Sequence, residues 1–345
     1  MNFMKKFIFT ILIFLTGIRA FSAEKENPQK TLGWNFGIEG IFGARFGKEG
    51  EIVWAKNSQN GDKYKLSELE WEYTPALYAG AKIGGGYKRF ELSFASIFFF
   101  PTSFGTMKDS DWNQDNGYGT GNTSIKTNYS ESDNKIKNGF ELELSFAFKF
   151  YPTNFLTLRP KISVGYQQME FNAMGGTLWY GNDEDGIAFN QNSYKGSYHS
   201  YDDLKNSISR TLPYEPVVKY SIQNIYFWTG VQADFLPTKK IVLSLATEAA
   251  PIVYMDSCDE HVLTNMVFRN MSLSAFFAVR QRARAQFNLN NNFSLALNLC
   301  VMLTGESTGV TYEKETSATL YNKFDDSSGA YSLFFDIGIS AKFVL

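Results

Sequence analysis

Two short acidic segments contain the residue types that could activate a water molecule. Asp259 and His261 lie two positions apart, and His261 is one of only two histidines in 345 residues. In an extended backbone both side chains leave the same face, so the carboxylate can orient the imidazole. Asp109 and Asp111 form a second pair with the same spacing, far away in the sequence. His261 could then accept a proton from water as a general base, while Asp109 and Asp111 position that water or share a proton.

Simpler interpretations of these residues stay open at this point. Acidic residues in loops are commonly just solvated. Cys258 is an alternative nucleophile, although a histidine that follows it along the same strand would point poorly at it. His199 lies beside Ser200 in a long polar segment, which leaves a lipid hydrolase with a Ser–His pair as another candidate. The proposed water chemistry itself calls for neither a metal nor a cofactor.

The elements that must carry these residues alternate between apolar and polar side chains. The clearest examples cover residues 140–150, 293–303 and 331–345. Such long alternation exceeds that of an ordinary half-buried strand and is typical of a tilted strand between lipid and a lumen. Less regular versions cover residues 36–46, 69–79, 90–100, 156–166, 225–235, 241–249 and 271–279. The sequence therefore predicts an all-β fold, a ten-stranded antiparallel transmembrane β-barrel.

Short and long connections alternate along the chain. Short ones are expected at 84–86, 152–154, 237–239 and 290–292, and long polar ones at about 47–65, 101–137, 174–212, 257–266 and 304–328. Short turns belong on the periplasmic side of a bacterial barrel, and long loops belong outside the cell. The two acidic segments follow the third and seventh strands, which are nearly opposite in a ring of ten. They could therefore face each other across the extracellular mouth.

The strand before His261 poses a difficulty, and the eighth strand limits the lumen. Carried on from residues 241–249, the alternation would direct Asp259 and His261 outward, so a bulge or turn is expected at about residues 249–251. Three arginines, Arg280, Arg282 and Arg284, alternate on the eighth strand and are expected to fill the lumen. We therefore expect chemistry at the mouth, without open diffusion through the barrel.

Targeting signals and composition set further bounds. Residues 1–23 combine Lys5 and Lys6, a short apolar run and small residues near Ser22 and Ala23, which predicts a cleaved secretory signal peptide in preference to a membrane anchor. Residues 24–345 would then form a single barrel domain. The formal net charge of −2 and the lack of a basic block argue against a nucleic-acid partner. Cys258 and Cys300 make neither a disulfide framework nor a metal motif, and free thiols are expected although a bridge stays open.

Four motifs in order resemble the omptin family of outer-membrane aspartyl-type endopeptidases. They are residues 65–71, residues 105–112, Gly165-Tyr166-Gln167 and the Asp-Glu-His at 259–261. The similarity runs from about residue 34 to residue 345. It implies a ten-stranded barrel with five external loops, located in the bacterial outer membrane, that cleaves polypeptides at the cell surface. The family's catalytic set would fall on Asp109, Asp111, Asp259 and His261.

The same resemblance implies a substrate-binding pocket. Residues 47–54 resemble the segment that carries the family's first pocket acid, which falls on Glu51. The second falls on Ser257, with Asp256 one position away. A carboxylate plus a hydroxyl would favour Arg or Lys before the scissile bond less strongly than two carboxylates would. Preference for basic substrates is therefore expected to be weak.

A membrane lipid is the other partner that the resemblance implies. A Tyr-x-Glu-x-Arg segment helps that family to hold lipopolysaccharide phosphates, and this chain has Tyr166-Gln167-Gln168-Met169-Glu170 instead. Because an anion replaces the cation, we expect the lipopolysaccharide site to be altered or missing. No oligomer is expected. A non-catalytic barrel, an adhesin whose loops bind host or matrix proteins, remains the alternative from a different functional class.

Overall fold

The computed structural model describes residues 34–56, 61–103, 105–112, 125–181, 200–203, 207–274 and 278–345. The predicted signal peptide, residues 1–23, lies outside the described residues, as does His199. Within these ranges every regular element is a β-strand. No helix among them is long and apolar enough to cross a membrane.

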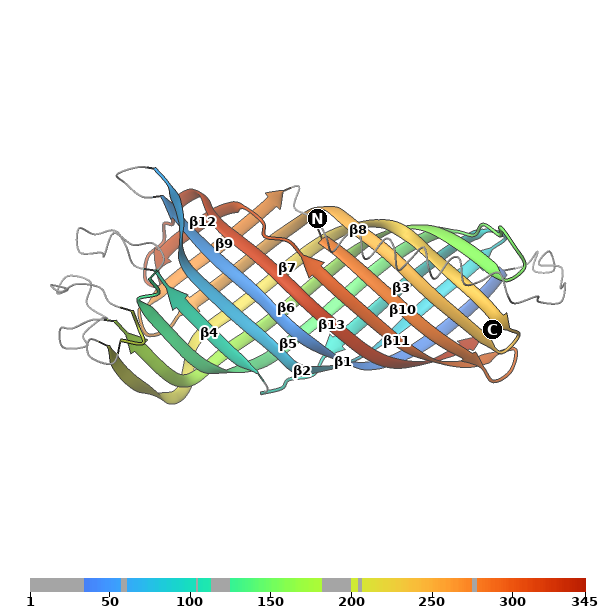
Figure 1. Ribbon diagram of the computed structural model, residues 1–345, viewed down its shortest axis with the longest axis horizontal. Coiled ribbons are helices and arrows are strands. Elements are labelled where there is room, and N and C mark those ends of the chain that lie inside the picture. Colours follow the sequence, from blue (N-terminus) through green and yellow to red (C-terminus); the bar gives the residue numbers. More distant parts are fainter. Residues whose placement is uncertain are drawn as a thin grey trace.

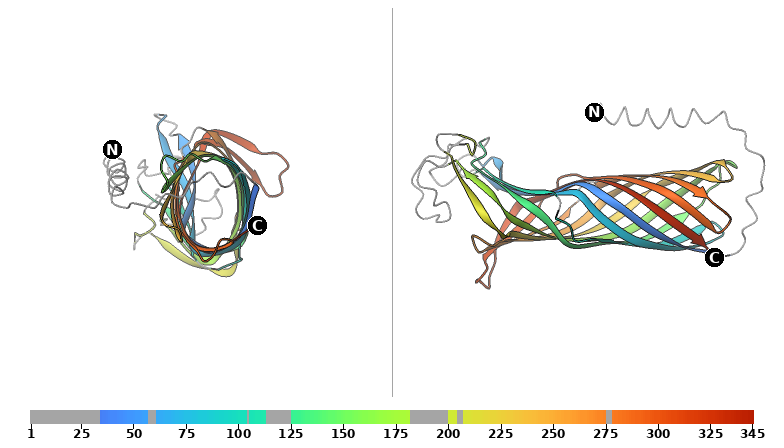
Figure 2. Two further views of the ribbon diagram at one scale, coloured as in Figure 1. Left: turned by 90° about the vertical axis from the view of Figure 1, so that its right-hand side faces the viewer. Right: turned by 90° about the horizontal axis from the view of Figure 1, so that it is seen from below.

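The described strands form a closed antiparallel ring (Figures 1 and 2). They are β1 (Trp34–Lys56), β2 (Lys63–Tyr87), β3 (Phe90–Phe99), β4 (Thr106–Asp111), β5 (Asn128–Phe148), β6 (Leu156–Tyr180), β7 (Ile208–Thr238), β8 (Ile241–His261), β9 (Met266–Ser274), β10 (Ala278–Asn288), β11 (Phe293–Thr304), β12 (Gly309–Glu315) and β13 (Asn322–Val344). Three short strands continue the line of a neighbour: β4 extends β3, β9 extends β10, and β12 extends β11. Pairing of β1 with β13 closes the ring, which confirms the predicted ten-stranded barrel.

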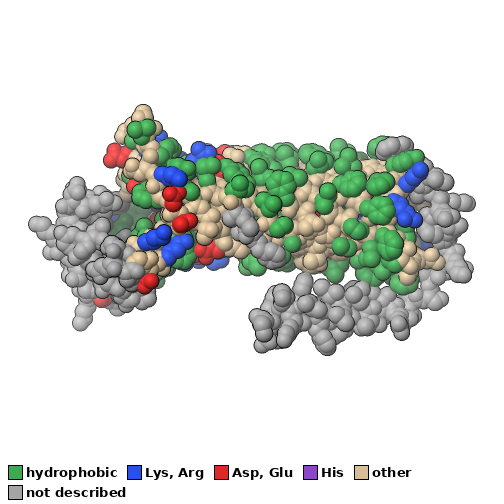
Figure 3. All heavy atoms as spheres, turned by 90° about the horizontal axis from the view of Figure 1, so that it is seen from above, with side chains coloured by type: hydrophobic (Ala, Val, Ile, Leu, Met, Phe, Trp, Pro, Cys, Tyr) green, Lys and Arg blue, Asp and Glu red, His purple; other side chains and the backbone are tan. Residues whose placement is uncertain are grey.

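Large apolar side chains cover the outside of the barrel. On β1, Phe36, Ile38 and Phe42 are all exposed, whereas Glu39 and Arg45 on the alternate face are buried. The same division recurs on β13, where Ile337 and Ile339 face outward. Figure 3 shows this apolar surface along the barrel, with acidic and basic side chains gathered at one end of it and some basic side chains at the other. A band of this kind is what lipid contact requires.

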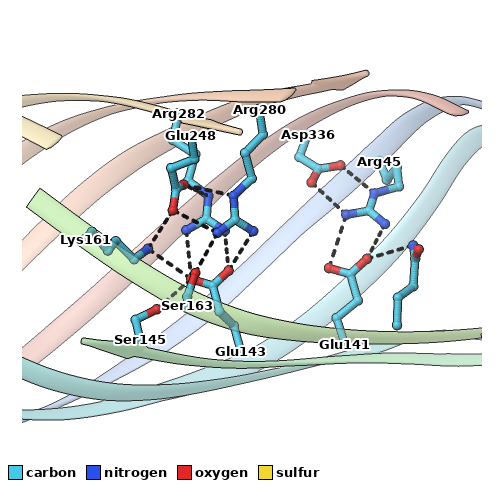
Figure 4. A network of polar contacts seen from close by, with 11 residues as sticks. Arg45, Glu141, Glu143, Ser145, Lys161, Ser163, Glu248, Arg280, Arg282 and Asp336 are labelled. Atoms are coloured by element: carbon cyan, nitrogen blue, oxygen red, sulfur yellow. Dashed lines mark hydrogen bonds and ion pairs between the residues drawn. The ribbon is translucent and has the colours of Figure 1, made fainter. Parts of the chain in front are cut away.

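Ion pairs and polar side chains fill the lumen. Arg280 lies 2.8 Å from Glu248 and 2.7 Å from Glu143, and Lys161 contacts the same two carboxylates (Figure 4). A second group joins Arg45 to Asp336 and Glu141. Arg282 also binds Glu143, and Arg284 binds Glu39. These arginines lie on β10, which is the eighth of the ten predicted strands. The expectation that they line the lumen is confirmed.

Several strands continue well beyond the apolar band. The predicted loop at residues 47–65 is wrong for most of its length, because β1 and β2 stay paired as far as Lys56 and Lys63. On the β2 extension, Leu69 and Trp71 are buried on the inner face, whereas the outer face carries Glu68, Glu70 and Glu72, so the exposed apolar side chains that reveal the membrane part are missing there. They flare into the wall of an open mouth, which also contains β4, β9 and β12 (Figure 1). The candidate residues lie on this wall.

The first short turn also differs from its predicted position. Residues 84–86 continue β2, and the chain turns at Lys88 and Arg89, where Lys88 has a φ of 55°. A Cβ atom on Gly85 would lie 2.8 Å from the Phe36 ring. The glycine therefore makes room for an aromatic side chain on the neighbouring strand and does not form the turn itself.

Candidate active site

The first acidic pair lies on β4, a short strand in the flared wall. Asp109 is opposite Leu69 of β2 and Ser130 of β5, and Asp111 follows on the same face. Ser67 and Asn128 hydrogen-bond the Asp111 carboxylate. The Oδ1 atom of Asp109 is buried without a hydrogen-bond partner among the described residues. One member of the pair is therefore held by its neighbours, and the other has an open acceptor.

A bulge on β8 directs the second pair inward. Phe227 pairs with Ile252 and Thr229 pairs with Ala249, so two residues of β8, Ala250 and Pro251, face one residue of β7. Even-numbered residues such as Glu248 are buried before the bulge, and odd-numbered ones such as Asp259 are buried after it. The bulge falls where the sequence predicts it. It changes which face of the strand lines the interior.

The second pair is joined by a direct hydrogen bond. His261 Nε2 lies 2.8 Å from Asp259 Oδ2, and the ring packs edge-on against Phe268 with centroids 5.4 Å apart. Asp259 is 1% exposed, whereas the His261 side chain keeps 24% of its surface exposed. The pair therefore has a buried carboxylate that orients a partly exposed ring.

Electrostatics connect the two pairs. Burial and the Asp111 charge raise the pKa of Asp109 to about 7, against the opposing charge of His261. Burial lowers the pKa of His261, but the hydrogen bond and charge of Asp259, with the charges of Asp109 and Asp111, raise it to about 9. Each pair acts on the protonation of the other, so all four predicted residues meet at one site. Such matched acids and bases are what water activation requires.

A polar pocket lies next to Asp259. Glu51 on β1 is 2% exposed and accepts hydrogen bonds from Ser257 Oγ at 2.9 Å and from Asn270 Nδ2 at 2.5 Å. Thr311 Oγ1 donates to Asn270 Oδ1 at 2.7 Å, which fixes the orientation of the amide. Ser257, Asn270 and Thr311 are cross-strand neighbours on β8, β9 and β12. Two of the three predicted pocket residues, Glu51 and Ser257, therefore lie together.

The third predicted pocket residue does not join them. Asp256 lies on the outer face of β8, where Arg269 binds its carboxylate through Nε at 2.9 Å and a terminal nitrogen at 2.6 Å. Cys258 shares that outer face, because it alternates with Asp259. Burial raises the pKa of the Cys258 thiol to about 11, so it is a poor nucleophile. Both Cys258 and Cys300 are free thiols.

Sequence reasoning missed Asn270, Thr311 and Tyr220. The first two appear ordinary until strand pairing places them beside Ser257. Tyr220 is the cross-strand partner of Asp259, and its buried hydroxyl has no hydrogen-bond partner within the described part of the chain. The missing information is the pairing of β8 with β9 and of β9 with β12, which a single sequence does not display.

Comparisons with other proteins support this architecture. A sequence model of the Omptin family matches residues 34–200. Among solved structures, the outer membrane protease OmpT from Escherichia coli aligns with a TM-score of 0.77 and 16% identity, covering 92% of this chain and 99% of that chain. The translocator domain of the autotransporter NalP from Neisseria meningitidis covers 94% of this chain and 91% of its own at 8% identity, but its TM-score of 0.31 carries no argument. No curated protein matches the sequence.

The fold and the charged mouth define an outer-membrane β-barrel of ten strands with a candidate hydrolytic site at one end. Within that class, residues 34–200 of the chain match the omptin family. That segment contains Asp109 and Asp111 and ends before Asp259 and His261. The second pair is placed at the site by the strand register alone.

Proposed function

We propose that the protein is an outer-membrane endopeptidase that hydrolyses peptide bonds of polypeptides at the cell surface. The match of residues 34–200 to the omptin family and the fold shared with OmpT support this activity. The observation that carries the proposal is the pair of Asp259 and His261, hydrogen-bonded at 2.8 Å and electrostatically coupled to Asp109 and Asp111.

In the proposed reaction, a water molecule lies between the two pairs. The ring nitrogen of His261 that does not contact Asp259 takes a proton from the water as its oxygen attacks the peptide carbonyl. Asp259 stabilises the imidazolium that forms, and Asp109 with Asp111 hold the water in position. The C–N bond then breaks, and His261 returns the proton to the leaving amine. The reaction consumes one water and needs no covalent intermediate.

The substrate side chain before the scissile bond would enter the pocket of Glu51 and Ser257. Because Asp256 is bound to Arg269 on the outer face, Glu51 is the one carboxylate of the predicted set that faces this pocket. A single carboxylate gives a weaker preference for Arg or Lys than a pair would. The mouth lies at the end with the long polar hairpins, opposite the short turns, and this arrangement supports a site that faces the outside of the cell.

The activity can be tested with purified barrel, refolded in detergent and supplemented with lipopolysaccharide. Peptides with Arg, Lys or a neutral residue at one position are incubated with the parent protein and with the variants His261→Ala and Asp109→Ala. Glu260→Gln is the matched control. Glu260 is next to His261 in the sequence, but its side chain points to the outer face, where it binds Lys219. Cleavage that is lost in both variants and kept in the control supports the proposal. Cleavage that survives in both would overturn the site, and a parent protein that cuts nothing would favour the adhesin alternative.

A further inference from the structure

We propose that Glu51 is a positioning residue that carries a proton and donates it in a hydrogen bond to Asp259, so that it holds the Asp259–His261 pair in place. This role differs from that of a fixed negative charge that binds a basic substrate side chain. Its effect on turnover rests on the endopeptidase activity proposed above, but the protonation of Glu51 itself does not.

The inference starts from an unsatisfied atom. Asp259 is 1% exposed, and its Oδ2 atom is hydrogen-bonded to His261. Its Oδ1 atom is buried and has no hydrogen-bond partner among the described residues. A buried carboxylate oxygen without a donor costs roughly 1–3 kcal/mol or more, so such atoms normally find one. A donor close to Asp259 is therefore needed.

The Glu51 carboxyl group is the neighbour that can supply this donor. It lies within hydrogen-bonding range of the Asp259 carboxylate and is buried beside it. Two carboxylates in contact in a buried site cannot both be ionised without strong repulsion. One shared proton replaces that repulsion with an O–H···O hydrogen bond, as in other buried acid pairs. The proton would satisfy Oδ1 of Asp259 at the same time.

The surroundings indicate which acid holds the proton. Asp259 faces the cationic ring of His261, which stabilises its ionised form. The hydrogen-bond partners of Glu51 are the neutral side chains of Ser257 and Asn270, and within the described ranges no lysine or arginine forms an ion pair with it. Burial, followed by the charge of Asp259, raises the pKa of Glu51 well above its ordinary value. The proton therefore belongs on Glu51.

Tyr220 is the rival donor. The titratable groups that face Glu51 are Asp259, His261 and Tyr220. The Tyr220 hydroxyl lacks a hydrogen-bond partner in the described structure, and Tyr220 is opposite Asp259 across the strand pair. Any test must therefore separate the two donors, and Tyr220→Phe does so without changing the ring.

A protonated Glu51 alters how the pocket selects substrates. A lysine or arginine side chain gains a full ion pair only after Glu51 has released its proton. The preference for basic over neutral residues should therefore be small at low pH and should increase as the pH rises. A permanently ionised glutamate would give a preference that does not change with pH over this range.

The first test measures the protonation of His261 directly. The chain has two histidines, so a ¹⁵N-histidine NMR titration of the full barrel in micelles resolves His261 once His199→Gln has assigned the other signal. Glu51→Gln keeps the shape and a donor but cannot be charged. If Glu51 is protonated, this variant leaves the pKa of His261 unchanged. If Glu51 is an anion, removing its charge lowers that pKa by about one unit, which would overturn the inference.

The second test measures turnover and separates the donors. Glu51→Leu removes the donor and should lower kcat more than it raises KM, since the pair is misoriented. Glu51→Gln, whose amide can still donate, should have a kcat at least about tenfold higher than that of Glu51→Leu. Tyr220→Phe should lose less than Glu51→Leu, and the reverse order would assign the donor to Tyr220. If even the parent protein cuts no peptide, the proposed activity fails, while the NMR titration still decides the state of Glu51.

Discussion

Charged side chains are buried both in the lumen and at the mouth of the barrel, but they are paired differently. In the lumen, Glu143 and Glu248 are surrounded by Arg280, Arg282 and Lys161. At the mouth, the Oδ1 atoms of Asp109 and Asp259 have no hydrogen-bond partner among the described residues. At the candidate active site, Asp109, Asp111, Asp259 and Glu51 surround His261, and Lys126 is a further cation that acts on Asp109.

This difference separates structure from chemistry within one barrel. A fully paired network lowers the cost of burying charge. An incompletely paired cluster retains the free-energy cost of its buried, unpaired oxygen atoms until a ligand or a water molecule binds them. The pKa values of its groups stay shifted from their usual range. We therefore expect substitutions in the lumen to change stability and substitutions at the mouth to change activity.

The largest effect should come from Asp109→Asn at the mouth. This variant removes the charge that faces His261 while keeping the shape of the side chain. We expect kcat/KM to fall by roughly 10²–10⁴-fold, the range for a lost acid–base group. The free energy of unfolding in urea should not fall, because the buried Oδ1 atom of Asp109 has no hydrogen-bond partner among the described residues. If the free energy of unfolding falls by as much as the free energy of transition-state binding, the proposed difference between the mouth and the lumen is wrong.

Glu143→Gln in the lumen should show the opposite pattern. Removing this charge leaves Arg280, Arg282 and Lys161 short of an anion, at a cost of about 3 kcal/mol in unfolding free energy. Turnover per folded molecule should stay within about twofold, because the network lies away from the mouth. Lys323→Ala, which breaks an exposed ion pair with Asp325, serves as the control and should change neither quantity. A stable Glu143→Gln barrel without activity would contradict the division.

The pH profile of kcat/KM tests the coupling within the mouth. Because the pKa of Asp109 is about 7 and that of His261 is about 9, the rate should rise through pH 7 and fall above pH 9. The same bell arises whichever of the two groups carries the proton in the active form. Asp111→Asn removes a charge that raises both pKa values, so both limbs should move to lower pH. If neither limb of the pH profile moves in that variant, groups other than Asp109 and His261 determine the profile.

The smallest effect is expected on the outer face of β6. Glu170 contacts Lys137 at 3.9 Å and accepts a hydrogen bond from Asn138, at the position where the omptin resemblance calls for an arginine. Glu170→Arg should strengthen lipopolysaccharide binding about tenfold, since each cation near anionic lipid contributes roughly 1 kcal/mol. Binding measured by the quenching of labelled lipopolysaccharide in micelles, with Lys56→Arg as the control, checks this. Equal binding by the parent protein would mean that the lipid site is not altered.

Much of the fold is readable from the sequence, because lipid imposes strict alternation on the membrane strands. Residues 140–150 and 331–345 show it plainly, and both strands lie where they are predicted. The outer hairpins are not readable in this way. The inner face of the extended β1 buries charged residues such as Glu49 and Glu51, so no regular apolar period distinguishes strand from loop, and residues 47–65 are misassigned.

The candidate site was predictable for a different reason. The Asp-x-Asp and Asp-x-His spacings place each pair on one face of a strand, and the structure keeps that arrangement for Asp109, Asp111, Asp259 and His261. Asp256 was grouped with the pocket by its position in the sequence, yet neighbouring residues of a strand point to opposite sides. Asn270 and Thr311 reach the pocket through cross-strand pairing, which a single sequence does not display.

The bulge at Ala250 and Pro251 adds one residue to β8, so the side chains beyond it face the opposite side of the strand. Deleting either residue would leave the apolar band of β8 untouched but would interchange every side chain farther along it. Cys258 and Glu260 would then enter the mouth, and Asp259 and His261 would leave it. A barrel of this family could thus lose its entire histidine dyad through a single-codon deletion while still assembling in the membrane.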